Sequence, residues 1–289
     1  MPFTVSQIHS QLAKTLIPLY GENEAGQMIR MLFEHFCRIS GVSLVLQKNN
    51  FLPPGQYERL QEALLQLSDH MPIQYILGRT WFYNLSFEVN SAVLIPRPET
   101  EEMVDLIVNG AMQSAESGNI KLLDVGTGSG CIAVALKKSL PLWHVDACDI
   151  SEEALQVARR NADYSGTSIN FFKADILRWK EWADSGSFHL IVSNPPYVCE
   201  SEKSQMQPHV LDHEPSLALF VPDDDPLVFY RAIAEFAASR LLQHGKLYLE
   251  INESYGSELV NLLKSLGYSD IELRKDFRGK ERFAIARKD

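Results

Sequence analysis

The chain has 289 residues, which is long for one domain and short for three, so one large and one small domain are expected. Its net charge is −10, and the residues from Pro96 onward hold 21 basic and 30 acidic side chains. So acidic a segment argues against a nucleic-acid backbone as the principal partner. A local basic patch can still exist, because five basic residues lie between positions 274 and 282.

The four cysteines form no C-x-x-C pair, which argues against both a zinc site and a disulfide framework. We expect small buried thiols in a reducing cytoplasm. The sequence shows neither a signal-peptide pattern nor an apolar run of 18 residues, so a cytoplasmic protein without a membrane span is expected. The three successive acids 223–225 cannot easily converge on one ion, and no metal is expected.

Residues 1–72 are predicted to form a small helical domain without chemistry of its own. A second helix fits Glu24–Arg38 and a third fits Tyr57–Leu67. Such a helical domain is suited to binding a partner, so a substrate-recognition role is predicted for it. The apolar residues of the first helix share one face: Ile8, Leu12, Leu16 and Leu19.

Residues 73–95 are predicted to be a β-hairpin linker. Pro72–Gly78 and Trp81–Val89 are short β-prone runs, with a possible turn at Asn84. Pro98 then suits the first turn of a helix that runs to about Met112. Arg97 stands between two prolines and either lines a cleft or is a surface residue on a rigid linker.

Residues 96–289 are predicted to form an α/β domain, because strands and helices alternate from Ile120 onward. The first strand is Lys121–Val125, the loop is Gly126–Gly130 and the helix is Cys131–Lys138. The glycines permit a tight turn and let backbone N–H groups approach a ligand. The spacing is G-x-G-x-G, not the dinucleotide-binding G-x-G-x-x-G.

Three acids follow the first three predicted strands or end them. Asp124 either meets a ligand ammonium group or braces the loop. Asp149 stands about 20 residues after the glycine loop, where an acid binds ribose hydroxyls. Asp175 could accept an adenine amino group, with Ile176 against the ring. Ser151 is predicted to cap the next helix. Together these signals predict a nucleoside-binding Rossmann-like sheet.

An apolar strand, Phe188–Val192, leads into Asn194, Pro195, Pro196 and Tyr197. The prolines lack the N–H that a central strand needs, so the chain must leave the sheet at Asn194. A residue before proline is held extended, at the strand end where open α/β sheets bind ligands. The segment is suited to accepting hydrogen bonds from a planar –NH2 group, with Tyr197 as an apolar wall; the alternative is an ordinary strand-ending turn.

The remaining elements complete the domain. They are a helix over Phe229–Leu242, a strand over Lys246–Ile251, a helix over Ser257–Leu266 and two closing strands, Ile271–Leu273 and Arg282–Ala286.

Two motifs carry a resemblance to known families. Asp124–Gly130 with Asp149 is similar to the cofactor signature of class I S-adenosylmethionine-dependent methyltransferases. The segment that begins at Asn194 resembles the motif of enzymes that methylate exocyclic or amide nitrogens. Three further segments resemble the release-factor glutamine methyltransferase family specifically: Gln74–Gly78, Leu94–Glu101 and Glu214–Phe220. Two segments depart from that family's pattern, namely Val221–Pro226 and Ile251–Ser254.

The resemblance implies a seven-stranded, mostly parallel methyltransferase sheet and S-adenosylmethionine as cofactor. It implies that the substrate is the glutamine of the Gly-Gly-Gln motif in peptide-chain release factors, methylated on N5. We expect a monomer with no direct nucleic-acid substrate. The expected cofactor-binding residues are Asp124, Gly126, Thr127, Gly128, Ser129, Gly130, Asp149, Asp175, Ile176 and Asn194. The expected substrate-binding residues are Asn194, Pro195, Pro196, Tyr197 and Arg97, with Asn194 and Tyr197 as catalytic residues.

Other functions stay open at this point. An adenine-N6 methyltransferase acting on nucleic acid would use the same Asn-Pro-Pro-Tyr segment on an aromatic amine, but the acidic balance argues against it. A ribosomal-protein glutamine methyltransferase lies between the two. A non-catalytic S-adenosylmethionine-binding adaptor would have no need of Asn194 and Tyr197.

Overall fold

The computed structural model describes residues 3–113, 120–182 and 186–289. Its contacts divide the chain into two compact units. The first unit consists of residues 1–78 together with 207–213, and the second consists of residues 79–206 together with 214–289. No helix of the described residues is long and apolar enough to cross a membrane.

The first unit is helical. Thr4 caps its first helix in a capping box with Gln7, where each side chain accepts a hydrogen bond from the other residue's backbone N–H. Apolar side chains on α1 and α3 form its buried core. The helices are α1 (Val5–Leu32), a π-helical turn η1 (Phe33–Cys37), α2 (Gly41–Leu46), α3 (Pro54–Ser68), α4 (Ile73–Leu77) and α8 (Pro208–Leu211).

Two predictions for this unit are wrong. Leu19 is 45% exposed, because helical spacing from buried Leu16 places Tyr20 toward the core instead, where its hydroxyl donates to the Leu67 carbonyl over 2.6 Å. The segment Ile73–Leu77 is a helix and not a strand. Ile73 and Leu77 are buried at helical spacing, and Gly78 ends the helix in the left-handed region with φ 68°.

The second unit begins with the predicted β-hairpin, formed by β1 (Arg79–Phe82) and β2 (Leu85–Glu88). Tyr83 and Asn84 both have positive φ, 49° and 59°. A two-residue turn with this backbone geometry matches the right-handed twist of the two strands, and asparagine is one of the residues that adopt it readily. The predicted turn at Asn84 is confirmed.

Within the described residues, seven strands form one sheet in the order β10-β11-β9-β6-β3-β4-β5. The neighbours from β9 to β5 run parallel, and β11 runs antiparallel to both β9 and β10. The predicted α/β fold with a mostly parallel seven-stranded sheet is confirmed. The strands are β3 (Lys121–Val125), β4 (His144–Asp149), β5 (Asn170–Lys173), β6 (Phe188–Ser193), β9 (Leu241–Glu250), β10 (Tyr268–Lys275) and β11 (Glu281–Lys288).

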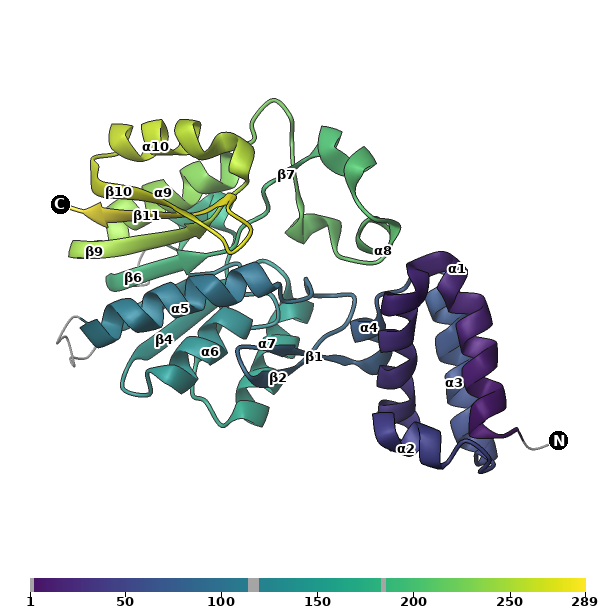
Figure 1. The fold of residues 1–289 in the computed structure, drawn as a ribbon. Coiled ribbons are helices and arrows are strands. Elements are labelled where there is room, and N and C mark those ends of the chain that lie inside the picture. The colour runs from purple at the N-terminus through teal and green to yellow at the C-terminus, as the bar shows by residue number, and fades with distance from the viewer. Residues whose placement is uncertain (1–2, 114–119, 183–185) are drawn as a thin grey trace. The chain divides into compact units, whose positions relative to one another are not determined.

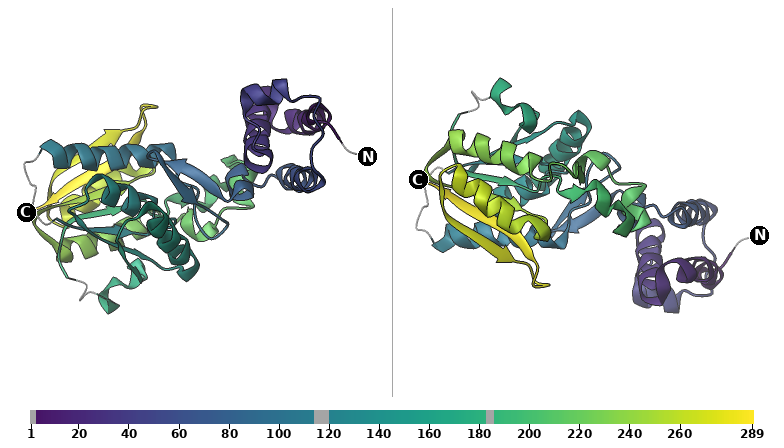
Figure 2. Two further views of the ribbon diagram at one scale, coloured as in Figure 1. Left: turned by 90° about the horizontal axis from the view of Figure 1, so that it is seen from below. Right: turned by 90° about the horizontal axis from the view of Figure 1, so that it is seen from above.

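Helices cover both faces of this sheet (Figure 1), and Figure 2 shows the two faces in turn. One face carries α5 (Pro98–Gln113), α6 (Cys131–Ser139) and α7 (Glu152–Ser165), and the other carries α9 (Val228–Arg240) and α10 (Gly256–Ser265). Each face has its own apolar core. Burial on both faces explains why the parallel strands read as continuous apolar runs.

Short elements connect these layers near the carboxyl ends of the parallel strands. One boundary differs from prediction, since Leu241 and Leu242 begin β9 and do not end the preceding helix. The short elements are η2 (Ile176–Glu181), β7 (Val198–Cys199), η3 (Glu200–Gln205), η4 (Ser216–Ala218), β8 (Phe220–Val221) and η5 (Glu253–Tyr255).

Candidate active site

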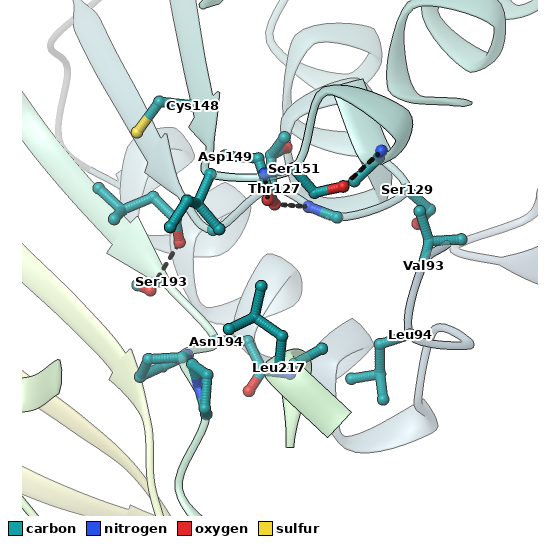
Figure 3. A pocket seen from close by; sticks show the side chains of 18 of the residues that line it. Val93, Leu94, Thr127, Ser129, Cys148, Asp149, Ser151, Ser193, Asn194 and Leu217 are labelled. Carbon is teal, nitrogen blue, oxygen red and sulfur yellow. Dashed lines mark hydrogen bonds between the residues drawn. The ribbon is translucent and has the colours of Figure 1, made fainter. Parts of the chain in front are cut away.

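A cavity of about 410 Å³ lies where β3, β4, β5 and β6 end. This volume falls within the roughly 300–1,000 Å³ of small-molecule sites. Figure 3 shows Asp149 and Thr127 on one side of the cavity, Asn194 and Leu217 opposite them, and Val93 and Leu94 along a third wall. The position agrees with the rule that open α/β sheets bind ligands at the carboxyl ends of their strands.

The glycine loop forms part of the cavity wall. Gly126 and Gly128 have φ values of 72° and 53°, which residues with a side chain rarely adopt. The backbone N–H of Gly126 donates to the Cys148 carbonyl over 2.9 Å, which holds the loop against the end of β4. Thr127 and Ser129 also line the cavity.

Gly130 lies outside the cavity lining and meets a packing requirement instead. Its φ is 79°, and a Cβ at this position would stand 3.0 Å from the Cβ of Ala158 on α7. The third glycine therefore lets α6 and α7 approach closely.

Asp124 also lies outside the cavity lining, because its side chain is fully buried beneath the loop. Thr127 Oγ1 donates to Asp124 Oδ2 over 2.6 Å, so the carboxylate braces the loop from below. Asp124 Oδ1 is buried and has no hydrogen-bond partner among the described residues. Burial raises the pKa of Asp124 to about 7.

Asp149 links the glycine loop to the start of α7. Its Oδ2 accepts from the Gly128 N–H over 2.8 Å, and its Oδ1 accepts from the Ser151 N–H over 2.9 Å. Each oxygen keeps further acceptor capacity, which suits a pair of neighbouring hydroxyls in the cavity. Burial raises the pKa of Asp149 above its ordinary value. Ser151 caps α7 as predicted, since its hydroxyl accepts from the Ala154 N–H.

Asp175 and Ile176 line the same cavity at the end of β5. Asp175 caps η2, because its Oδ1 accepts from the Leu177 N–H over 2.9 Å. The carbonyl of Asp175 accepts from the indole N–H of Trp182 over 2.9 Å. Both bonds fix the edge of the cavity that β5 contributes.

Asn194 follows β6 directly and lines the cavity together with Pro195 and Pro196. The strand end is anchored, since Ser193 Oγ donates to the Val125 carbonyl of neighbouring β3 over 2.7 Å. The Asn194 amide nitrogen donates to Thr100 Oγ1 over 3.1 Å. The carboxamide is thus held on one side, while the residue faces the cavity on the other.

Tyr197 is not among the residues that line the cavity. Its hydroxyl donates to Glu250 Oε1 over 3.1 Å, and its backbone N–H donates to the Leu219 carbonyl over 3.2 Å. Burial and the Glu250 carboxylate raise the pKa of Tyr197 above its ordinary value. In this structure Tyr197 anchors the segment behind Asn194.

Arg97 lines the cavity and forms an ion pair with Glu214. The distance between Arg97 Nη2 and Glu214 Oε1 is 2.7 Å, and the Ile95 N–H donates to Glu214 Oε2 over 3.3 Å. Glu214 is buried. This ion pair therefore links two segments beside the cavity that are 117 residues apart in the sequence.

Sequence reasoning assigned no role to Thr100, Glu214 or Glu250, which the structure places around Asn194 and Arg97. A usable signal existed for Glu250, because it ends a parallel strand at the same sheet edge as Asn194. No group of three or more acids, histidines or cysteines that could hold a metal ion occurs among the residues the structure describes.

Two known families match parts of the chain. The family described as "Methyltransferase small domain" matches residues 105–213, and the family described as "PrmC N-terminal domain" matches residues 10–78. Among solved structures, human methyltransferase 10 domain containing protein is 18% identical, with a TM-score of 0.52 over 71% of this chain and 90% of that chain. At that identity the likeness concerns the fold alone.

Curated relatives match over nearly the whole length. The release factor glutamine methyltransferase of Flavobacterium psychrophilum is 41% identical and covers 96% of this chain and 97% of its own. The protein of that name from Bacteroides thetaiotaomicron is 40% identical, over 98% of this chain and 99% of its own. With this identity over this length, and with the fold and the cavity described above, the chain belongs to the release factor glutamine methyltransferase family, which consists of S-adenosylmethionine-dependent methyltransferases.

Proposed function

We propose that this protein transfers a methyl group from S-adenosylmethionine to the side-chain nitrogen N5 of the glutamine in the Gly-Gly-Gln motif of peptide-chain release factors. The observation that carries the proposal is the position of Asn194. Its carboxamide follows the central strand β6 and faces the same cavity as the glycine loop and Asp149. Methyl donor and nitrogen acceptor would thus meet in one site.

The residues present fit the proposed cofactor. Glycines at positive φ let the loop backbone lie close to a ligand, and Asp149 keeps acceptor capacity toward the cavity for ribose hydroxyls. Asp175 and Ile176 offer an acceptor and an apolar surface to the adenine. When bound, S-adenosylmethionine supplies a sulfonium methyl group, and its transfer forms one N–C bond, breaks one S–C bond and releases one amide proton.

An amide nitrogen is a poor nucleophile because its lone pair is delocalised into the carbonyl group, so the enzyme must act mainly by positioning. Well-oriented reactants can gain roughly 7–11 kcal/mol from proximity and orientation. We propose that Asn194 Oδ1 and the Pro195 carbonyl accept the two hydrogens of the substrate amide. This aims the nitrogen across the cavity and raises its electron density.

The presence of both a helical unit and a sheet unit supports a protein as the substrate. The curated relatives are named for release factor glutamine methylation, and they share the helical unit as well as the sheet unit. The local basic patch of the sequence is largely neutralised, since Arg274 pairs with Glu272, Lys280 with Glu253 and Arg282 with Asp276. We propose that the helical unit helps to hold the release factor.

The test is a labelling experiment. The wild-type protein is incubated with S-adenosylmethionine that carries a labelled methyl group, and separately with a release factor, ribosomal proteins, DNA and RNA. The proposal expects label on the release factor alone, located by mass spectrometry on the glutamine side chain of the Gly-Gly-Gln motif. A release factor with glutamate at that position is the matched control. Label on nucleic acid, or equal label on the glutamate control, would overturn the proposal.

A further inference from the structure

Three side chains from separate parts of the sheet unit form a chain of hydrogen bonds at the cavity wall, where Asn194 and Thr100 line the cavity and Glu250 does not. Thr100 lies in the first turn of α5, and Glu250 is the last residue of β9. Thr100 Oγ1 lies 2.7 Å from Glu250 Oε2, and the Asn194 amide nitrogen lies 3.1 Å from Thr100 Oγ1. Thr100 and Glu250 are 2% and 1% exposed, so bulk water has little access to these bonds.

The direction of each bond follows from the protons available. Burial raises the pKa of Glu250, whereas the Thr100 and Tyr197 hydroxyls and the Arg282 charge favour its ionised form. With Glu250 ionised, its carboxylate only accepts, so Thr100 donates to Oε2 and Tyr197 donates to Oε1. A threonine hydroxyl has a single proton, so the Thr100 oxygen can only accept from Asn194. The –NH2 group of Asn194 must therefore face Thr100, and Oδ1 is the polar atom that Asn194 offers to the cavity.

We propose that Thr100 and Glu250 are positioning residues that fix the Asn194 carboxamide with its oxygen toward the cavity, so that the site selects a substrate bearing –NH2 over one bearing a carboxylate. The inference rests on the proposed function and adds two residues to it. A reversed carboxamide would bring two oxygens to within 3.1 Å with no proton between them. In the fixed orientation a glutamine –NH2 donates to Oδ1, whereas a glutamate carboxylate would meet that oxygen as a second acceptor.

Three variants at one position separate orientation from packing. Thr100→Val keeps the shape of the side chain and removes the hydroxyl. Thr100→Ser keeps the hydroxyl and removes a methyl group. Thr100→Ala lacks both and serves in place of the valine variant if circular dichroism shows that the latter does not fold.

Two quantities test the inference in each variant, and the calorimetric affinity for S-adenosylmethionine is the control. The first is the single-turnover rate of methyl transfer to a Gly-Gly-Gln peptide. The second is the ratio of affinities for Gly-Gly-Gln and Gly-Gly-Glu peptides with S-adenosylhomocysteine bound, a state in which no turnover occurs. For Thr100→Val we expect a rate at least about tenfold lower, the scale of one hydrogen bond, and a smaller preference for the glutamine peptide. Thr100→Ser should stay within about threefold of wild type in both, and the cofactor affinity should change less than about threefold throughout.

The outcomes distinguish this inference from the proposed function. If the wild-type protein does not methylate the glutamine peptide or a release factor, the proposed function fails and the inference fails with it. If the wild type is active and Thr100→Val keeps the wild-type rate and glutamine preference, only the inference is overturned. Equal losses in Thr100→Val and Thr100→Ser would also overturn it, because a packing role would then explain the effect.

Discussion

Asp149 is the residue through which the glycine loop, the start of α7 and the cavity are joined. It accepts hydrogen bonds from the N–H groups of Gly128 and Ser151 while it lines the cavity. A ligand hydroxyl bound there would therefore meet an acceptor that is already held in place by two backbone bonds. This geometry makes the carboxylate a preorganised ligand-binding group.

Replacing Asp149 by alanine is expected to weaken S-adenosylmethionine binding by about 1–3 kcal/mol, the scale of a lost hydrogen bond to a charged group. Asp149→Asn keeps one acceptor oxygen and should lose less. Isothermal titration calorimetry measures both affinities, and circular dichroism checks that each variant is folded. Unchanged affinity in Asp149→Ala would remove this residue from the cofactor site.

The buried carboxyl group of Asp124 is expected to make the free energy of unfolding depend on pH. Its pKa is about 7 in the folded chain, against 3.8 for the ordinary side chain, because it is buried. Between about pH 4 and pH 7 the folded state therefore binds more protons than the unfolded state, so this residue makes stability fall as the pH rises through that window. Asp124→Asn should remove up to about 1.4 kcal/mol per pH unit of that fall.

Urea unfolding at a series of pH values between 4.5 and 8 measures this slope. Asp163→Asn, at an exposed position of the same unit, is the control for the loss of one carboxylate. An Asp124→Asn variant with the same slope as the wild type would show that the buried carboxyl group does not titrate in this range.

At the residue scale, the sequence was sufficient to predict side chains that stand directly at strand ends. Asp149, Asp175 and Asn194 all lie at the cavity, because the carboxyl ends of parallel strands share one edge. Glu250 also ends a strand and so carries the same signal, whereas Thr100, in the first turn of α5, carries none. Their meeting with Asn194 depends on β9 lying next to β6 and on α5 covering that end of the sheet, which no local pattern specifies.

At the scale of elements, two connecting segments hold the cavity walls in place. Arg97, between the hairpin and α5, reaches Glu214 in the segment before η4. The side chain of Glu214 has 0% exposure and that of Arg97 has 32% exposure. Removing only the arginine would leave a carboxylate buried without its cation, which is costly.

Arg97→Met is therefore expected to lower the free energy of unfolding by about 3 kcal/mol. The double variant Arg97→Met with Glu214→Gln should recover most of that loss, since no buried charge remains. Arg231→Met, which breaks an ion pair with Asp225 whose side chains are 42% and 37% exposed, is the matched control and should cost no more than about 1 kcal/mol. Chemical denaturation compares the three, and equal losses in the single and double variants would contradict the account.

A segment that departs from the family's pattern has a structural role of its own. Asn252, after β9, donates from its amide nitrogen to the Tyr197 carbonyl and to Glu202 Oε2, each over 3.1 Å. It thereby ties the turn after β9 to the segment that follows Asn194. The other departing segment holds three acids, two of which have clear partners: Asp223 accepts from Ser201 and Asp225 pairs with Arg231.

Helix starts were predictable where the sequence marks them, as Pro98 does for α5, the glycine loop for α6 and Ser151 for α7. The segment Ile73–Leu77 was not, because five residues are too few for periodicity to separate a helix from a strand. The break near the middle of α1 was predicted, because the second helix was placed separately at Glu24–Arg38. Gly21 interrupts α1 with φ 77° and ψ 166°, and the residues on either side remain helical.

At the scale of the whole molecule, the helical unit has its own apolar core and the sheet unit contains every residue of the cavity. We expect a truncated chain that begins at Ile73 to bind S-adenosylmethionine with an affinity near that of the full chain. It should methylate an intact release factor poorly and keep more of its activity on a short Gly-Gly-Gln peptide. Comparison of kcat/KM for the two substrates measures this difference, and an unchanged value on the intact release factor would refute a partner-holding role.

The central claim is that the Asn194 carboxamide positions the substrate amide for methyl transfer. The most direct test is the single-turnover rate of glutamine methylation by Asn194→Ala, because product release cannot mask the chemical step under those conditions. We predict a rate about 10²–10³ lower than that of the wild type, as for other lost transition-state hydrogen bonds, with S-adenosylmethionine affinity within about threefold. A variant that methylates the glutamine at nearly the wild-type rate would contradict the claim.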